Sequence, residues 1–343
     1  MIYLIFLVPF IFSSLVEVIQ QKNNKFLIAI LGVFLVLFAS LRNHVGTDWP
    51  AYYHFYQYGV HNVEIGYATL NNLFGNQRLP FYIFLIAINC ISIGLISKSL
   101  VKFSAIPILS LLIYYSDLYL YFNFSGMRQA IAMSITTFAL IYSIGNKRNI
   151  YIFFGLILLA MSFHISSIIF SLAYFIPQRK LKNKEIVILA VSFMFFSSLV
   201  YIASSFLTGV FASKAEFYLE HQEQASNATL NFIIGLLRRS ITILLIFAFG
   251  KKFIFKHNLS AYIFNLYIIG FGIYATTYLI SPDIGVRMSV YFTVLEMFLL
   301  ANLLFLVKRV DVKFLLFFIV LLISIYKLYT YTLLPAYDYQ SIL

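Results

Sequence analysis

The chain of 343 residues is 62% hydrophobic and 10% charged, a composition typical of integral membrane proteins that leaves no room for a sizeable soluble domain. Its net charge of +12 does not indicate nucleic acid as a partner, because the basic excess lies in loops between apolar segments and follows the positive-inside rule. Cys90 is the only cysteine, which excludes an intrachain disulfide and a cysteine-based metal cluster.

Twelve apolar segments follow one another along the chain, and most approach the ~20 residues that a membrane-spanning helix needs. They cover residues 1–19, 26–41, 80–97, 104–122, 126–144, 149–163, 164–177, 185–208, 229–249, 259–280, 285–306 and 314–334. We therefore predict an all-α fold, a polytopic helical bundle of about twelve transmembrane segments. The bundle is predicted to form one transmembrane domain over residues 1–343.

The stretch 149–177 is long for one spanning helix and short for two, and Ser162-Phe163-His164 interrupts it. We interpret it as a tight hairpin or a broken helix that bends near the outer leaflet. A single tilted helix would instead reverse the orientation of every later segment. The distribution of lysines favours two passes.

The basic residues separate the two faces of the membrane. Sixteen of the 24 lie in six loops that would share one side, namely 20–25, 98–104, 145–149, 178–184, 250–257 and 307–313. With the acidic residues included, that side carries +12 and the other side carries no net charge. The lysine-rich side is therefore predicted to be cytoplasmic, with both termini outside. Two long outer loops are predicted at 42–79, which is polar and aromatic, and at 209–228, which is acidic and expected to form a short surface helix.

Arginine, rather than lysine, dominates the predicted outer side, and some arginines lie inside apolar segments, where a permanent charge requires an anionic partner. A diphosphate suits several planar guanidinium groups near the membrane surface. The predicted diphosphate-binding residues are Arg42, Arg128, Arg238, Arg239 and Arg287. The alternative is that they form structural salt bridges, for which the available carboxylates include Asp48, Asp117, Glu216 and Asp283.

Two residues are candidates for a catalytic base. His164 is a polar residue at the predicted bend, and Asp48 lies in the glycine-containing turn 45–49 near Arg42. The alternatives are a buried structural histidine and an Asx turn before Pro50. Glu64 and Asp283 are weaker candidates. The histidines of the first outer loop have no metal-binding spacing, so neither a metal site nor a cofactor is predicted.

Aromatic rings near the outer polar groups are candidates for stacking on sugars, although an interfacial aromatic belt would have the same composition. The predicted sugar-binding residues are Tyr52, Tyr53, Tyr67, Gln129, Tyr278, Asp283 and Tyr291. No glycine-rich phosphate loop, His-Glu-x-x-His or Gly-x-Ser-x-Gly motif occurs, which argues against kinases, ATPases and soluble hydrolases. Arginines without a nucleotide site suggest a substrate already activated as a lipid diphosphate.

Four stretches of the sequence carry a resemblance to a known family. They are Leu41-Arg42-Asn43-His44-Val45-Gly46-Thr47-Asp48-Trp49 with Tyr52-Tyr53, Glu64-Ile65-Gly66-Tyr67, Met127-Arg128-Gln129-Ala130-Ile131-Ala132, and Ser162-Phe163-His164-Ile165-Ser166. Their order and spacing, together with Arg287 and Tyr291, resemble the EpsG-type branch of the Wzy polysaccharide polymerases over about residues 40–295. Trp49 stands where another aromatic is more usual in that family.

The resemblance implies a metal-independent, inverting glycosyltransferase in the bacterial inner (plasma) membrane, with its active site facing the periplasm or the exterior. Its donor and acceptor would be oligosaccharide repeat units on undecaprenyl diphosphate, joined into surface polysaccharide such as capsule or O-antigen. The helical bundle would be similar to GT-C glycosyltransferases. A chain-length regulator and a flippase are the expected protein partners, beside the lipid bilayer itself.

Two other functions compete with this interpretation. A flippase for lipid-linked oligosaccharide would also bind a lipid diphosphate through arginines, but transporters often show similar halves, and these halves do not. A membrane acyltransferase that modifies surface polysaccharide would be expected to have a catalytic histidine near a cytoplasmic donor site. His257 is the only histidine in the predicted cytoplasmic loops.

Overall fold

A computed structural model describes residues 2–60, 62–144, 148–210 and 228–342. These residues form helices joined by turns, apart from one isolated β-bridge between Arg42 and Ser341, so the all-α prediction is confirmed for the described part of the chain. Contacts divide the chain into two compact units, residues 1–175 with 296–343 and residues 176–295. The predicted acidic helix within 209–228 falls almost entirely outside the described residues.

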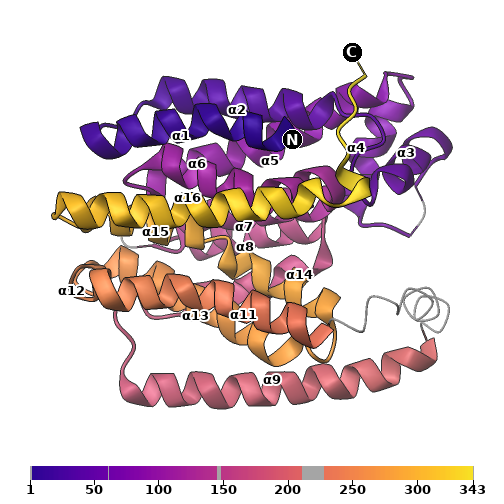
Figure 1. Cartoon of the computed structure of the whole chain (residues 1–343). Helices are drawn as coiled ribbons and strands as arrows, with labels where there is room; N and C mark the ends of the chain where they lie inside the picture. The colour runs from indigo at the N-terminus through magenta and orange to yellow at the C-terminus, as the bar shows by residue number, and fades with distance from the viewer. Residues whose placement is uncertain (1, 61, 145–147, 211–227, 343) are drawn as a thin grey trace. The chain divides into compact units, whose positions relative to one another are not determined.

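The first unit contains most of the helices. They are α1 (Ile2–Gln20), α2 (Lys25–Ser40), α3 (Trp49–Tyr58), α4 (Ile65–Gly75), α5 (Phe81–Phe103), α6 (Pro107–Tyr114), the π-helix η1 (Tyr115–Ser125), α7 (Met127–Ala139), η2 (Leu140–Tyr142), α8 (Ile150–Met161), the 3₁₀-helix η4 (Ile165–Phe175), α15 (Glu296–Leu306), α16 (Val310–Thr332) and η7 (Pro335–Tyr337). In Figure 1 the long helices of this unit run side by side, with α1 against α6 and α2 against α5.

The second unit contains α9 (Asn183–Val210), α11 (Ala228–Leu245), the π-helix η6 (Ile246–Gly250), α12 (Lys251–Ile254), α13 (Asn258–Thr277) and α14 (Pro282–Thr293). Helix α13 contacts α9, α11 and α14. At Gly270 the backbones of α13 and α14 come close, because an added Cβ would lie 2.7 Å from the Phe292 Cβ and 3.0 Å from the Ser289 carbonyl oxygen. Small residues allow such close helix packing in membranes.

Among the described residues, six helical stretches are long and apolar enough to cross a membrane. They are Ile2–Gln20, Phe81–Phe103, Ala228–Gly250, Asn258–Thr277, Pro282–Leu306 and Val310–Thr332. Shorter apolar helices cover Lys25–Ser40, Ile150–Met161 and Ile165–Phe175. The chain is therefore a multi-pass membrane protein, whereas the count of twelve segments stays a prediction.

The stretch 149–177 folds back on itself. Arg148, just before α8, donates a hydrogen bond of 2.7 Å to the carbonyl oxygen of Tyr174 near the end of η4, and its guanidinium lies 4.1 Å from the centre of the Tyr174 ring. Asn149 caps α8 by accepting a hydrogen bond from the Ile152 amide. The two arms are therefore antiparallel, and His164 lies at the bend between them.

Buried polar side chains join the helices of the first unit. Asn123 of η1 donates hydrogen bonds of 3.0 Å to Asn89 and to Ser92 of α5, and it accepts one of 2.7 Å from Tyr114. Asn89 in turn donates to Ser40 of α2. Because polar groups in an apolar interior are costly unless they are hydrogen-bonded, these bonds fix how α2, α5 and η1 are aligned.

Polar contacts join helices at both ends of the first unit. At one end Glu17 accepts a 2.7 Å hydrogen bond from the Ile108 amide, and Asn302 donates to the Phe103 carbonyl, which brings together loops that are predicted to be cytoplasmic. At the other end Tyr3 donates to the Tyr337 carbonyl, so the described residues near both termini lie together. An even number of passes requires the termini to share one side.

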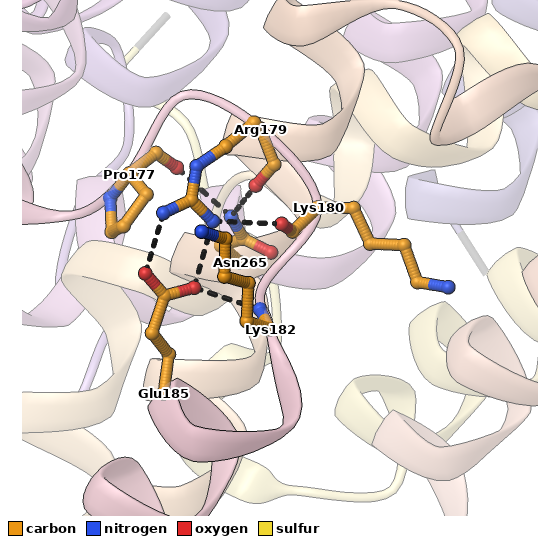
Figure 2. A network of polar contacts seen from close by, with 6 residues as sticks. All are labelled: Pro177, Arg179, Lys180, Lys182, Glu185 and Asn265. Atoms are coloured by element: carbon orange, nitrogen blue, oxygen red, sulfur yellow. Dashed lines mark hydrogen bonds and ion pairs between the residues drawn. The ribbon is translucent and has the colours of Figure 1, made fainter.

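In the second unit, the polar loop before α9 is tied to α13 (Figure 2). Asn265 is buried and donates hydrogen bonds to the carbonyl oxygens of Pro177 (3.0 Å) and Arg179 (2.7 Å). Arg179 forms a bidentate ion pair with Glu185, whose carboxylate also accepts from the Lys182 amide at 2.7 Å. An acidic residue that reaches back from the first turn in this way stabilises the start of α9.

Candidate functional site

Three charged or titratable side chains from distant parts of the sequence meet in the first unit. Glu64 precedes α4, Arg128 is the second residue of α7, and His164 lies at the bend between α8 and η4. The Glu64 carboxylate pairs with the Arg128 guanidinium through Oε2, and its Oε1 lies 3.0 Å from His164 Nδ1. The side chains of Glu64, Arg128 and His164 are 18%, 26% and 11% exposed, so a ligand can still reach the cluster.

Glycine allows the backbone beside Glu64 to approach the bend. The Gly66 amide donates a 2.7 Å hydrogen bond to the Ser162 carbonyl oxygen, and a Cβ at Gly66 would lie 2.8 Å from that oxygen. The Ile165 amide also points at Glu64 Oε1, at 3.4 Å. The start of α4 and the bend of the hairpin are thus joined on both sides of the Glu64–His164 contact.

The cluster holds Glu64 as a carboxylate. Burial would raise its pKa, but the hydrogen bond from His164 and the charge of Arg128 outweigh burial and lower the pKa of Glu64 to about 2. Glu64 is therefore ionised at neutral pH. It is an acceptor on both of its oxygens.

Two buried tyrosines, Tyr52 and Tyr67, lie next to Arg128. Tyr52 of α3 is buried and hydrogen-bonded to Arg128, and the rings of Tyr52 and Tyr67 are 5.6 Å apart. Burial raises the pKa of both phenols, so both are neutral donors at physiological pH. Among the described residues, Arg128 Nε and the Tyr67 hydroxyl are buried without a hydrogen-bond partner. Unpaired buried donors of this kind occur where a ligand or solvent completes the site.

The other candidate base, Asp48, lies outside this cluster. It is exposed just before α3, and the structure gives its carboxylate a 3.0 Å hydrogen bond from the Thr47 hydroxyl. Next to it, the Trp49 ring stacks on that of Tyr53 with 4.9 Å between their centres, and the tilted His44 ring lies 4.1 Å from Trp49. Glu64, which the sequence indicates less strongly than Asp48, is the carboxylate that meets His164.

Arg42 is used within the protein. Its side chain is 1% exposed and donates to the carbonyl oxygens of Ala39, Val45 and Phe124, the last two at 3.1 and 3.0 Å. Its guanidinium also lies 4.8 Å from the centre of the Phe124 ring. Burial lowers the pKa of Arg42 to about 10, which still leaves it charged at neutral pH. Its role as a diphosphate ligand stays an untested prediction.

In the second unit, Arg239 of α11 is buried against α13. Its guanidinium carbon lies 3.7 Å from the centre of the Tyr274 ring, and it donates a 3.0 Å hydrogen bond to the Gly235 carbonyl. Gly235 has no side chain to interfere with the Tyr274 hydroxyl. Arg238 is half-buried beside it. The ring of Tyr278, half-buried, lies 4.9 Å from that of Tyr274.

The last predicted arginine, Arg287, pairs with Asp283 at 2.7 Å, one helical turn apart at the start of α14. Gly285, between them, lets α14 approach the backbone of Tyr278. Arg239 therefore lies against Tyr274 of α13, whereas Arg287 pairs with Asp283 within α14. Two predicted sugar-binding residues, Gln129 and Tyr291, are buried, at 5% and 0% exposure.

The predicted site residues are divided between the units. Arg128, His164 and the aromatic residues of the first outer loop belong to the first unit, and Arg238, Arg239 and Arg287 to the second. Convergence of all these arginines on one ligand stays a prediction. Among the described residues, no three side chains of His, Cys, Asp or Glu are grouped as metal ligands.

A multi-pass helical membrane protein with a carboxylate–arginine–histidine cluster is the class of protein that these observations define. The family comparison agrees, because the EpsG family profile matches residues 25–341. The chain belongs to the EpsG family, which is linked to surface polysaccharide biosynthesis, and the resemblance found in the sequence is confirmed. No curated protein and no solved structure matches the chain, so a GT-C-like arrangement stays a prediction.

Proposed function

We propose that the protein is a polysaccharide polymerase that joins oligosaccharide repeat units carried on undecaprenyl diphosphate, at the outer face of a bacterial plasma membrane. The observation that carries the proposal is the cluster of Glu64, Arg128 and His164, partly exposed at the end of the first unit that the charge pattern assigns to the outside. Membership in the EpsG family supports a role in surface polysaccharide synthesis.

The reaction is a single displacement at the anomeric carbon of the donor. The acceptor hydroxyl oxygen bonds to C1, the bond from C1 to the diphosphate oxygen breaks, and undecaprenyl diphosphate leaves with the bonding electrons. The configuration at C1 is inverted. His164 takes the hydroxyl proton as a general base.

Arginines stabilise the leaving group. Negative charge grows on the diphosphate as its bond to C1 breaks, so guanidinium groups near it lower the barrier more than they strengthen ground-state binding. Arg238, Arg239 and Arg287 bind the diphosphate in this reaction. Arg42 is left out, because its donors already meet backbone carbonyls.

The exposed fraction of each tyrosine side chain determines whether it can stack on a sugar. Tyr53 is 39% exposed and Tyr278 is half-buried, so their faces are open to sugar rings. Tyr52 is buried behind Arg128, and Tyr67 and Tyr291 are fully buried. These three tyrosines pack within the protein and are not open to a sugar.

The direct test uses purified protein in liposomes with synthetic lipid-linked repeat units, and the products are separated by size. Wild type should make long chains, with or without EDTA. Arg239→Ala and Arg287→Ala should reduce the rate at least ~100-fold, since loss of one donor to a developing charge commonly has this effect. Arg309→Ala is the matched control, because Arg309 is 76% exposed and pairs with Asp311 in a predicted cytoplasmic loop.

The result that would contradict the proposal is a wild-type protein that makes no polymer but moves the lipid-linked unit across the bilayer, as a flippase does. Transfer of an acyl group to the sugar would contradict it in favour of an acyltransferase. Normal chain lengths in both arginine variants would overturn the diphosphate assignment alone.

A further inference from the structure

The contact between Glu64 and His164 determines which imidazole nitrogen is available for chemistry. Glu64 Oε1 lies 3.0 Å from Nδ1, and the other oxygen of this carboxylate pairs with Arg128. An ionised carboxylate accepts hydrogen bonds and donates none. Nδ1 must therefore carry a proton, which leaves the lone pair of the neutral ring on Nε2.

The surroundings hold this arrangement in place. The Gly66–Ser162 hydrogen bond joins the start of α4 to the bend that carries His164, so the two backbone segments that carry Glu64 and His164 are held next to each other. Arg128 holds the second carboxylate oxygen, and Tyr52 holds Arg128. The Glu64 carboxylate is therefore held by the Arg128 cation, which is in turn hydrogen-bonded to the neutral phenol of Tyr52.

We infer that Glu64 is a positioning residue, which keeps His164 in the Nδ1-protonated form with Nε2 as the base and stabilises the imidazolium that forms in the reaction. Arg128 acts on the histidine through this carboxylate. The inference rests on the proposed function and deepens it. When the acceptor hydroxyl attacks C1, its proton passes to Nε2, and the imidazolium then releases a proton to water.

The kinetic test compares Glu64→Gln and Glu64→Asp with wild type in the liposome assay. Glutamine keeps the size of the side chain and removes its charge, so kcat should fall at least ~100-fold, within the range of general-base catalysis, while KM changes less than about threefold. Glu64→Asp should recover part of the rate. Asp338→Asn is the control, because Asp338 is exposed near the same end of the first unit.

A pH profile separates positioning from a general structural defect. The groups that face His164 are the Glu64 carboxylate and, beyond it, Arg128 with Tyr52. Loss of the negative charge makes the imidazolium less stable, so the acidic limb of kcat/KM should move to lower pH in Glu64→Gln. A defect in folding would lower the rate at every pH and leave the limb in place.

A spectroscopic measurement does not depend on polymer formation. ¹⁵N-histidine NMR of the full chain should show His164 protonated on Nδ1 in wild type and mixed tautomers in Glu64→Gln, with His164→Asn identifying the signal among the six histidines. An Nε2-protonated wild type, or an unchanged kcat and acidic limb in Glu64→Gln, would overturn the inference. A wild type without polymerase activity would overturn the proposed function, and the tautomer would still be decided.

Discussion

Arg42 is an arginine whose hydrogen-bond donors are used inside the protein. The sequence groups it with the other outer arginines, but its guanidinium is buried among the carbonyl oxygens of Ala39, Val45 and Phe124. The sequence contains no sign of this, because the acceptors are backbone atoms, one of them 82 residues away. A planar group with five donors can meet several carbonyls at once, as lysine cannot.

Arg42→Lys should therefore destabilise the protein by about 2–4 kcal/mol, since carbonyl groups in a buried site lose their donors. The measurement is thermal unfolding in detergent. Arg78→Lys is the control, because Arg78 is exposed in the same outer loop, and a change of less than about 0.5 kcal/mol is expected there. If Arg42→Lys is as stable as the control and still makes no polymer, Arg42 binds substrate.

The ion pair of Glu64 should make the unfolding free energy of the protein depend on pH. Its pKa in the folded protein is about 2, against 4.5 for an unperturbed glutamate, so folding favours the ionised form by about 3 kcal/mol. This stabilisation is complete above about pH 4.5 and is lost as the pH falls towards 2. The difference in unfolding free energy between wild type and Glu64→Gln should shrink over that interval. A difference that stays constant from pH 6 to pH 3 contradicts the ion pair.

At the scale of elements, the hairpin formed by α8 and η4 depends on its contact with α4. Gly66→Ala should push the start of α4 away from Ser162 and separate Glu64 from His164, since the added methyl would lie 2.8 Å from a backbone oxygen. Overpacking of this kind costs about 1–3 kcal/mol. We expect a lower unfolding midpoint together with loss of polymer.

The control for this change is Gly155→Ala in the middle of α8, where an added methyl meets open space. Alanine is a better helix former than glycine by about 1 kcal/mol, so this variant should be at least as stable as wild type. Equal behaviour of the two glycine variants would show that the contact between α4 and the bend is unimportant.

Some of the secondary-structure elements could be predicted from the sequence and others could not. The bend at His164 was predictable, because Ser162-Phe163-His164 breaks a long apolar stretch. Helix α3 was not predicted within the outer loop, although Trp49, Tyr52 and Tyr56 are buried on one face at helical spacing. The π-helix η1 has no distinct sequence pattern. Its Asn123 is hydrogen-bonded to Asn89 and Ser92, which lie more than 30 residues earlier in the sequence.

For the whole molecule, the testable property is orientation in the membrane. In a Cys90→Ser background, single cysteines in place of Asn76 and Gln340 should react with a membrane-impermeant maleimide added to intact cells. Cysteines in place of Lys22 and Lys308 should react only after permeabilisation. All four positions are exposed in the structure. Positions 76 and 308 reacting from the same side would contradict the predicted topology.

The sequence by itself determined the class of protein, the predicted orientation and the family, because hydropathy, charge asymmetry and short motifs are properties of neighbouring residues. Only the tertiary structure decided which polar residues meet: Glu64 with His164 and Arg128, and Arg42 with backbone carbonyls. Glu64 is separated from Arg128 by 64 residues and from His164 by 100, and Arg42 from the Phe124 carbonyl by 82. These contacts depend on helix packing, and the contact between Glu64 and His164 also on the close approach at Gly66. A pattern of local residues carries no record of those distances.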